Sequence, residues 1–162
     1  MAKTWLPRIS LLAMCLAQIH AQLTLAGATC DTVAFCSIRF CALRSAARAK
    51  NVSFVIGSSL NAGFISGSPR YNYGKESYKI PAAFIEKRRK LLDVAANHGV
   101  DLRTAALQFS AAPDVASALV VGCKSEQQIL ADYTSMQTKI PAEFWADLKA
   151  RNLIEQNAPV PA

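Results

Sequence analysis

Two stretches of the chain combine residue types that can bind a phosphate group. In residues 118–130 an apolar run ends at Gly122, Lys124 follows, and a helix is expected to begin at Ser125. The backbone N–H groups and the positive end of that helix would face the same spot as the lysine ammonium group. Residues 53–63 repeat the passage from an apolar run into a turn that contains glycine and serine. The two stretches predict consecutive strand–helix units that share an anionic ligand.

An ordinary turn between a strand and a helix also explains the first stretch. Ser125 and Gln128 fit the S-x-x-Q capping box, in which the two side chains satisfy N–H groups at the start of a helix. Lys124 would then be a solvated side chain without a ligand. The residues alone leave both interpretations open.

The pattern of apolar residues and breakers indicates the elements that position these turns. Residues 52–56 and 116–121 are short apolar runs and predict two buried strands. Between them, Pro81 is expected to open one helix, and Asp101 to cap a second helix that ends at Pro113. The residues expected to face the core are Phe84, Leu91, Leu92 and Ala95 on the first helix and Leu102, Ala105, Ala106 and Phe109 on the second.

The remaining segments complete an alternating pattern. Residues 42–50 predict a short helix, and residues 63–79 predict a loop. The helix from Ser125 is expected to run to about Tyr133, and a last helix to start at Ile140 and Pro141. Strands that alternate with helices indicate an α/β fold with a parallel sheet. Two parallel strands need neighbours, so residues 51–155 are expected to be part of a larger sheet, followed by a loose tail over residues 156–162.

Composition sets bounds on the class of protein. The chain has 162 residues, of which 52% are hydrophobic and 18% charged, as in a globular domain. It is shorter than the roughly 250 residues of a complete eight-stranded α/β barrel. A net charge of +7 fits an anionic ligand, an anionic surface or nucleic acid. The basic run at residues 87–90 lies within an amphipathic helix without an aromatic platform, so we expect no nucleic-acid partner.

The cysteines and histidines do not have the spacing of a metal site. None of the cysteines forms a C-x-x-C pair, and the two histidines, His20 and His98, lie far apart. We therefore expect no metal. The cysteines are Cys15, Cys30, Cys36, Cys41 and Cys123.

Residues 1–28 have the outline of a secretory signal. Lys3 and Arg8 precede a short apolar run over residues 9–17, and small residues follow at 26–28. An amphipathic or buried segment of a cytosolic protein has the same outline. We expect a cytoplasmic protein, or a secreted or periplasmic one if these residues act as a signal.

Five segments, in this order and with this spacing, resemble the aldo/keto reductase family. They are Val55–Phe64, Arg70–Tyr73, Ala105–Phe109, Val120–Ser125 and Ile140–Trp145. From about Asn51 to Ile154 the chain is similar to the C-terminal portion of these enzymes, and most of all to the D-threo-aldose (L-fucose) dehydrogenase type. No single segment is specific, but the ordered set is.

The resemblance implies a fold and a cofactor. The family is a (β/α)8 TIM barrel that binds NADP or NAD, so residues 52–56 and 116–121 would be its seventh and eighth strands. The chain would then be a partial barrel of two strand–helix units and a C-terminal helix, preceded by an unassigned segment, 1–50, that is signal-like or frame-altered. Loops after these two strands often bind phosphate in barrels.

The resemblance also implies which residues hold the cofactor. Ser58, Leu60 and Gly63 would line the pyrophosphate. Gly122, Cys123, Lys124 and Ser125 would hold the adenosine end, and Gln128 and Asp132 would lie near the 2′-phosphate and the adenine. The family commonly has asparagine in place of Asp132. A carboxylate only accepts hydrogen bonds and repels phosphate, so the choice between NAD and NADP stays open.

No catalytic residue is assigned. The family's catalytic Asp, Tyr, Lys and His come from the first four strands, for which this sequence has no counterpart. Two classes of function follow. The first is an NAD(P)-dependent oxidoreductase acting on sugars or aldehydes, in a truncated or degenerate form that keeps part of the cofactor site. The second is a non-catalytic secreted or interaction protein built on a barrel remnant. In either case open strand edges favour self-association.

Overall fold

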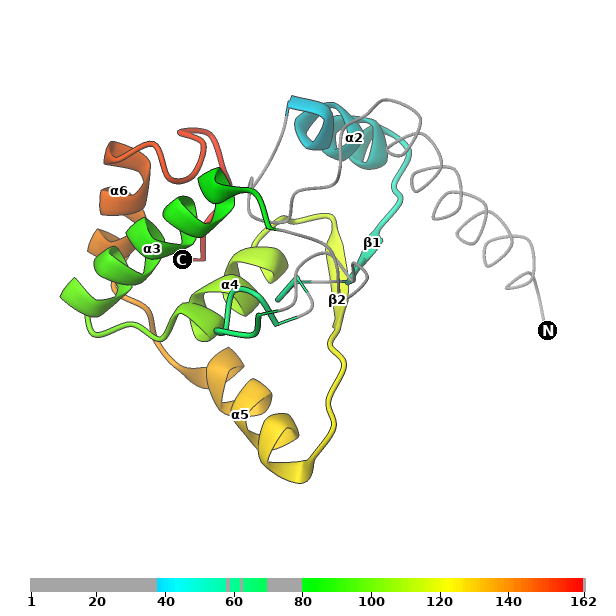
Figure 1. Ribbon diagram of the computed structural model, residues 1–162. Coiled ribbons are helices and arrows are strands. Elements are labelled where there is room, and N and C mark those ends of the chain that lie inside the picture. The colour runs from blue at the N-terminus through cyan, green and yellow to red at the C-terminus, as the bar shows by residue number, and fades with distance from the viewer. Residues whose placement is uncertain (1–37, 58, 62, 70–79, 162) are drawn as a thin grey trace. The chain divides into compact units, whose positions relative to one another are not determined.

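The computed structural model describes residues 38–57, 59–61, 63–69 and 80–161. Helices alternate with strands along the chain, which confirms the expected α/β class (Figure 1). In order, the elements are α2 (Ile38–Ala49), β1 (Phe54–Gly57), α3 (Ala82–Asn97), α4 (Leu102–Ala111), β2 (Ala116–Val120), α5 (Glu126–Gln137) and α6 (Ala142–Ala150).

The strands β1 and β2 pair in parallel, with α3 and α4 in the connection between them. The backbone N–H of Phe54 donates to the Val115 carbonyl at 2.7 Å, and the Ser117 hydroxyl donates to the Phe54 carbonyl at 3.0 Å. Gly57 lies opposite Val120 at the carboxyl ends of the strands. The turns after the two strands therefore leave the sheet at the same edge, as the sequence predicts.

The core lies among the helices rather than over the sheet. Phe64, Leu91 and Phe144 are each at most 1% exposed and belong to a cluster formed mainly by α3, α4, α6 and the segments next to them. Val120 of β2, by contrast, is 62% exposed. The remaining buried members of the cluster are Ile65, Val94, Ala95, Leu102, Ala105, Ala106, Phe109, Ile140, Trp145, Leu148, Leu153, Ile154 and Ala158.

The expected face of α4 is confirmed, and that of α3 is corrected at one position. Leu92 is 45% exposed, whereas Val94 is fully buried. Leu91, Val94 and Ala95 follow the i, i+3, i+4 spacing of one helical face, and Leu92 lies about 100° further around the helix. The prediction that Leu92 faces the core, like its buried neighbour Leu91, is therefore wrong.

Contacts between helices set the length of α5. The sequence places its end near Tyr133, but the helix continues to Gln137. Gln108 of α4 donates from its side-chain amide to the carbonyls of Ser135, at 2.7 Å, and Thr138, at 2.5 Å. Packing against α4 thus supports a last turn whose own apolar pattern is weak.

The C-terminal segment packs although the sequence favours a loose tail. Ala158 is 3% exposed and belongs to the core cluster. The Gln156 side chain donates to the Lys149 carbonyl at 2.6 Å. Within the described residues, no helix has the length and apolar character of a membrane span, and no group of three or more His, Cys, Asp or Glu side chains could hold a metal ion.

Candidate cofactor site

The turn between β2 and α5 is held by the capping interactions that the sequence predicts. Ser125 is the N-cap of α5, and its hydroxyl accepts the backbone N–H of Gln128 at 3.3 Å. The Gln128 side-chain oxygen accepts the backbone N–H of Lys124 at 2.7 Å. In a capping box this second bond usually goes to the N–H of the N-cap residue, and here it goes to the N–H of Lys124, one residue earlier. It fixes the backbone of the turn against the helix.

This turn carries several groups that can bind an anion. The first-turn N–H groups of Glu126 and Gln127 have no acceptor within a helix, and they lie at its positive end. The Ser125 hydroxyl and the exposed Lys124 lie next to them in the chain. The Glu126 carboxylate lies in the same first turn, and its negative charge acts against the binding of an anion.

The Asp132 carboxylate, which the family resemblance implies to lie near the 2′-phosphate and the adenine, is bound by two side chains of the chain itself. Its Oδ1 accepts bonds from Arg103 of α4, at 2.9 Å from Nε and 2.5 Å from Nη2. Its Oδ2 accepts a bond from the Cys123 thiol at 3.1 Å. Both oxygens are thus engaged by the chain itself, and the repulsion of phosphate expected from a bare carboxylate is offset by a cation.

Arg103 is the residue of this site that the sequence did not reveal. It lies 29 positions before Asp132 and on a different helix, so no local pattern links the two. Its Nη2 also reaches the Gln128 carbonyl at 3.3 Å. The sequence clue is the carboxylate itself, because a shielded Asp needs a cationic partner.

The electrostatics of the turn act on Cys123. The hydrogen bond to Asp132 is the main cause that raises the pKa of the Cys123 thiol, with desolvation and the charge of Asp132 adding to it. The Arg103 charge opposes this rise in pKa. The thiol is therefore kept protonated and serves as a hydrogen-bond donor in the turn.

The turn after β1 is shaped by its backbone. The Leu60 carbonyl accepts the N–H of Gly63 at 2.9 Å, and Gly63 has a φ of 85°. A side chain at Gly63 would meet Cβ of Ser68 at 3.0 Å, so glycine is needed for both conformation and space. The Leu60 side chain packs against the core. Ser58 lies outside the described residues.

The geometry can be compared with known proteins. A sequence model of the Aldo/keto reductase family matches residues 41–152. The chain belongs to the aldo/keto reductase family. The resemblance of individual motifs begins at about Asn51, whereas this match begins ten residues earlier and includes most of α2.

A curated aldo/keto reductase relative supports the assignment over a similar region. The chain is 30% identical over 109 residues to the pyridoxal 4-dehydrogenase of Microbacterium luteolum. The aligned region covers 67% of this chain and 32% of that protein. The chain therefore spans about a third of the length of its relative.

The donor groups of the turn fit the nicotinamide dinucleotide that aldo/keto reductases use. The exposed Lys124 and the Ser125 hydroxyl directly precede the first-turn N–H groups of α5 in the chain, and these are the donor types that phosphate oxygens need. The pairing of Asp132 with Arg103 offsets the charge of Asp132, and Glu126 remains as a negative charge in the first turn of α5. These residues can hold the group, and the turn after β1 leaves the sheet at the same edge.

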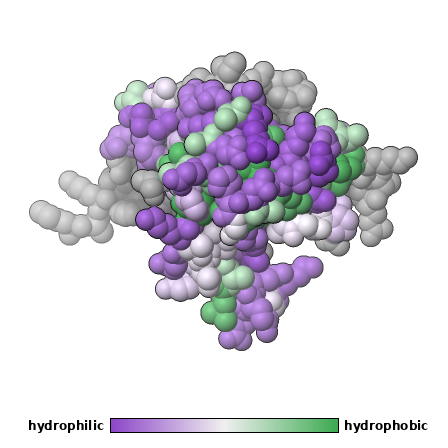
Figure 2. Space-filling model, turned by 90° about the vertical axis from the view of Figure 1, so that its left-hand side faces the viewer, coloured by the Kyte–Doolittle hydropathy of each residue, from purple (hydrophilic) through white to green (hydrophobic). Residues whose placement is uncertain are grey.

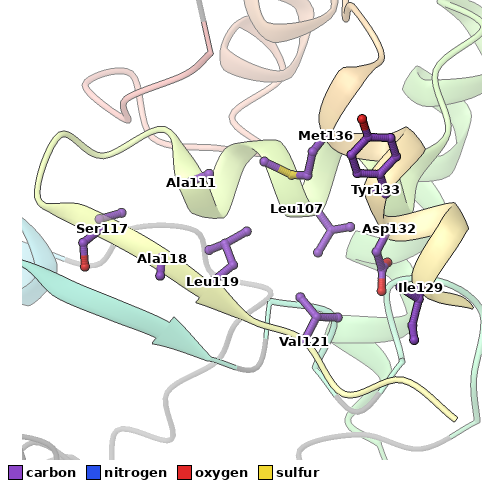
Figure 3. Close-up of a pocket in the computed structure, with 11 residues that line it drawn as sticks. Leu107, Ala111, Ser117, Ala118, Leu119, Val121, Ile129, Asp132, Tyr133 and Met136 are labelled. Atoms are coloured by element: carbon purple, nitrogen blue, oxygen red, sulfur yellow. The ribbon is translucent and has the colours of Figure 1, made fainter.

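An apolar groove of about 520 Å³ lies between β2, α4 and α5. In Figure 3, Leu107, Leu119 and Val121 extend into the space between the strand and the helices, and Asp132 lies at its margin. The groove offers few polar groups and is not the phosphate site. Its other lining residues are Ala111, Ala116, Ser117, Ala118, Ile129, Tyr133 and Met136.

Proposed function

We propose that residues 122–125 and the first turn of α5 bind the phosphate-bearing adenosine end of a nicotinamide dinucleotide, NADP or NAD. The observation that carries this proposal is the capped turn, in which the Lys124 backbone is tied to Gln128 and Lys124 directly precedes the N-cap of α5. Leu60 and Gly63, with Ser58, would approach the pyrophosphate from the neighbouring strand. In this proposal β1 and β2 are the seventh and eighth strands of a barrel.

The reaction to which this part contributes is proposed from the family. We infer an oxidoreductase that acts on an aldehyde or on the CH–OH group of a sugar. The name of the pyridoxal 4-dehydrogenase relative supports an aldehyde or alcohol as the substrate. The bound nicotinamide would supply or accept the hydride. The described residues would bind and orient the dinucleotide, and no proton transfer is assigned to them.

A titration with NADPH tests the site directly. A charge-assisted phosphate contact contributes about 1.5–3 kcal/mol, so Lys124→Ala is expected to weaken binding by roughly tenfold or more. Nicotinamide fluorescence or calorimetry measures the dissociation constant. Lys139→Ala, which removes an exposed lysine beyond the end of α5, is the matched control. Equal affinities for wild type and Lys124→Ala, or no binding by wild type, would contradict the proposal.

A second candidate function is an interaction protein, and one observation favours it. The helix α5 exposes large apolar side chains, among them Ile129 at 59% and Tyr133 at 66%, which also line the groove between β2, α4 and α5. In Figure 2 a small hydrophobic patch lies among hydrophilic side chains at the lower end of the molecule, at the height of α5 in Figure 1. We propose self-association through this surface, in a protein that is cytoplasmic, or secreted or periplasmic if residues 1–28 act as a signal.

A further inference from the structure

We propose that Arg103 is a positioning residue for the dinucleotide site and determines how well that site tolerates phosphate. The inference rests on the proposed function. Arg103 stands in the first turn of α4, outside the turn that would touch the ligand. Through Nε and Nη2 it binds Oδ1 of Asp132, and through Nη2 it also reaches the Gln128 carbonyl.

The carboxylate of Asp132 connects three parts of the structure. One oxygen binds Arg103 of α4, and the other accepts the Cys123 thiol of the turn after β2. Asp132 itself belongs to α5, whose first turn carries the proposed phosphate donors. The clamp formed by Arg103, Asp132 and Cys123 therefore holds the turn against both helices.

Burial makes the clamp more consequential than a surface ion pair. The Arg103 side chain is 23% exposed and that of Asp132 is 14% exposed, so water compensates little for a lost partner. Without Arg103, a shielded carboxylate would remain beside Cys123 at the proposed phosphate site. That charge would repel a phosphate group and offset the attraction of Lys124.

The clamp leads to opposite expectations for substitutions of Arg103 and of Asp132. Arg103→Gln leaves the Asp132 charge unpaired, so the affinity for NADPH should fall about fivefold or more, a typical coupling between sites. The affinity for NADH, which lacks the 2′-phosphate, should fall less. Asp132→Asn removes the repelling charge and should keep or improve NADPH binding. The double variant should return toward wild type, because two neutral carboxamides can pair without a net charge.

The alkylation rate of Cys123 reports on the clamp without any dinucleotide. Asp132 raises the pKa of the Cys123 thiol and Arg103 opposes that rise. At mildly alkaline pH, Asp132→Asn should therefore speed iodoacetamide labelling of the Cys123 peptide, and Arg103→Gln should slow it. Mass spectrometry of that peptide separates it from the other cysteines. Arg44→Gln, which removes the ion pair between Arg44 and Asp114, is the matched control and should change neither readout.

The outcomes separate this inference from the proposed function. If wild type binds no dinucleotide, the proposed function fails, and the ligand assigned to the clamp fails with it. A second outcome is that binding depends on Lys124, but Arg103→Gln leaves both the ratio of NADPH to NADH affinity and the Cys123 labelling rate at wild-type values. That outcome overturns the inference about Arg103 and leaves the proposed function standing. A changed affinity ratio that the double variant restores supports it.

Discussion

Thr104 of α4 and Ser135 of α5 hydrogen-bond through their hydroxyl groups at 3.0 Å, and the two residues are only 6% and 5% exposed. The Thr104 hydroxyl also lies 2.8 Å from the carboxylate of Asp101, the N-cap of α4. This buried polar contact joins the helices that carry Arg103 and Asp132. The helix contact that aligns the candidate site is therefore specified by hydrogen bonds as well as by apolar packing.

Ser135→Ala should lower the free energy of unfolding by about 1–3 kcal/mol, because it leaves the buried Thr104 hydroxyl with one partner fewer. Thr104→Val combined with Ser135→Ala should cost less than the sum of the single changes. Urea denaturation followed by circular dichroism measures both effects. Thr134→Ala, at an exposed neighbouring position, serves as control. Strict additivity of Thr104→Val and Ser135→Ala would show that the two hydroxyls do not act as a pair.

The attachment of α2 to the segment before β2 should depend on pH. Asp114 accepts a hydrogen bond from Arg44 at 2.8 Å and another from Arg48. The bond from Arg44 is the main cause that lowers the pKa of Asp114 below its ordinary value of 3.8, and Arg48 lowers it further. A carboxylate whose pKa is depressed on folding stabilises the fold above its unfolded pKa, and that contribution is lost as pH falls through the folded pKa.

The difference in unfolding midpoint between wild type and Asp114→Asn should therefore be constant near neutral pH and should shrink below pH 3.8. Urea midpoints measured from about pH 7 to about pH 2 test this expectation. Glu143→Gln, an exposed carboxylate in the first turn of α6, provides a comparison without an arginine bridge to another element. A difference that persists unchanged in acid would mean that the pair contributes through packing rather than charge.

Local patterns predicted most of the elements and the shape of the turn. The capping box at Ser125 and Gln128 and the core face of α4 depend on residues three or four positions apart, so the sequence shows them directly. The partner of Asp132 could not be predicted in this way, because Arg103 is 29 positions away and meets it only after α4 packs on α5. The place of Asp132 near the ligand stays a prediction of the family resemblance, and the structure adds the contacts of Asp132 with Arg103 and Cys123.

We expect self-association through the apolar surface that α5 and β2 expose. On α5, Ile129, Leu130 and Tyr133 are each more than half exposed, and Val120 at the end of β2 is 62% exposed. Within the described residues the sheet has two strands, so one edge of each has no partner strand among these residues. Exposed apolar patches and open strand edges both favour association with another chain. We expect wild type at micromolar concentration to be larger than a monomer.

Charged substitutions on α5 should reverse this association. Ile129→Lys combined with Leu130→Lys places two cations on the apolar surface, and like charges would then meet at any contact between two copies. Light scattering coupled to size exclusion should show a shift toward the monomer mass, with helix content retained by circular dichroism. Leu92→Lys changes an equally apolar residue, 45% exposed, on α3 and should leave the assembly unchanged. A wild-type chain that is a stable monomer would contradict self-association. A Leu92→Lys variant that dissociates as readily as the α5 variant would place the contact elsewhere than on α5.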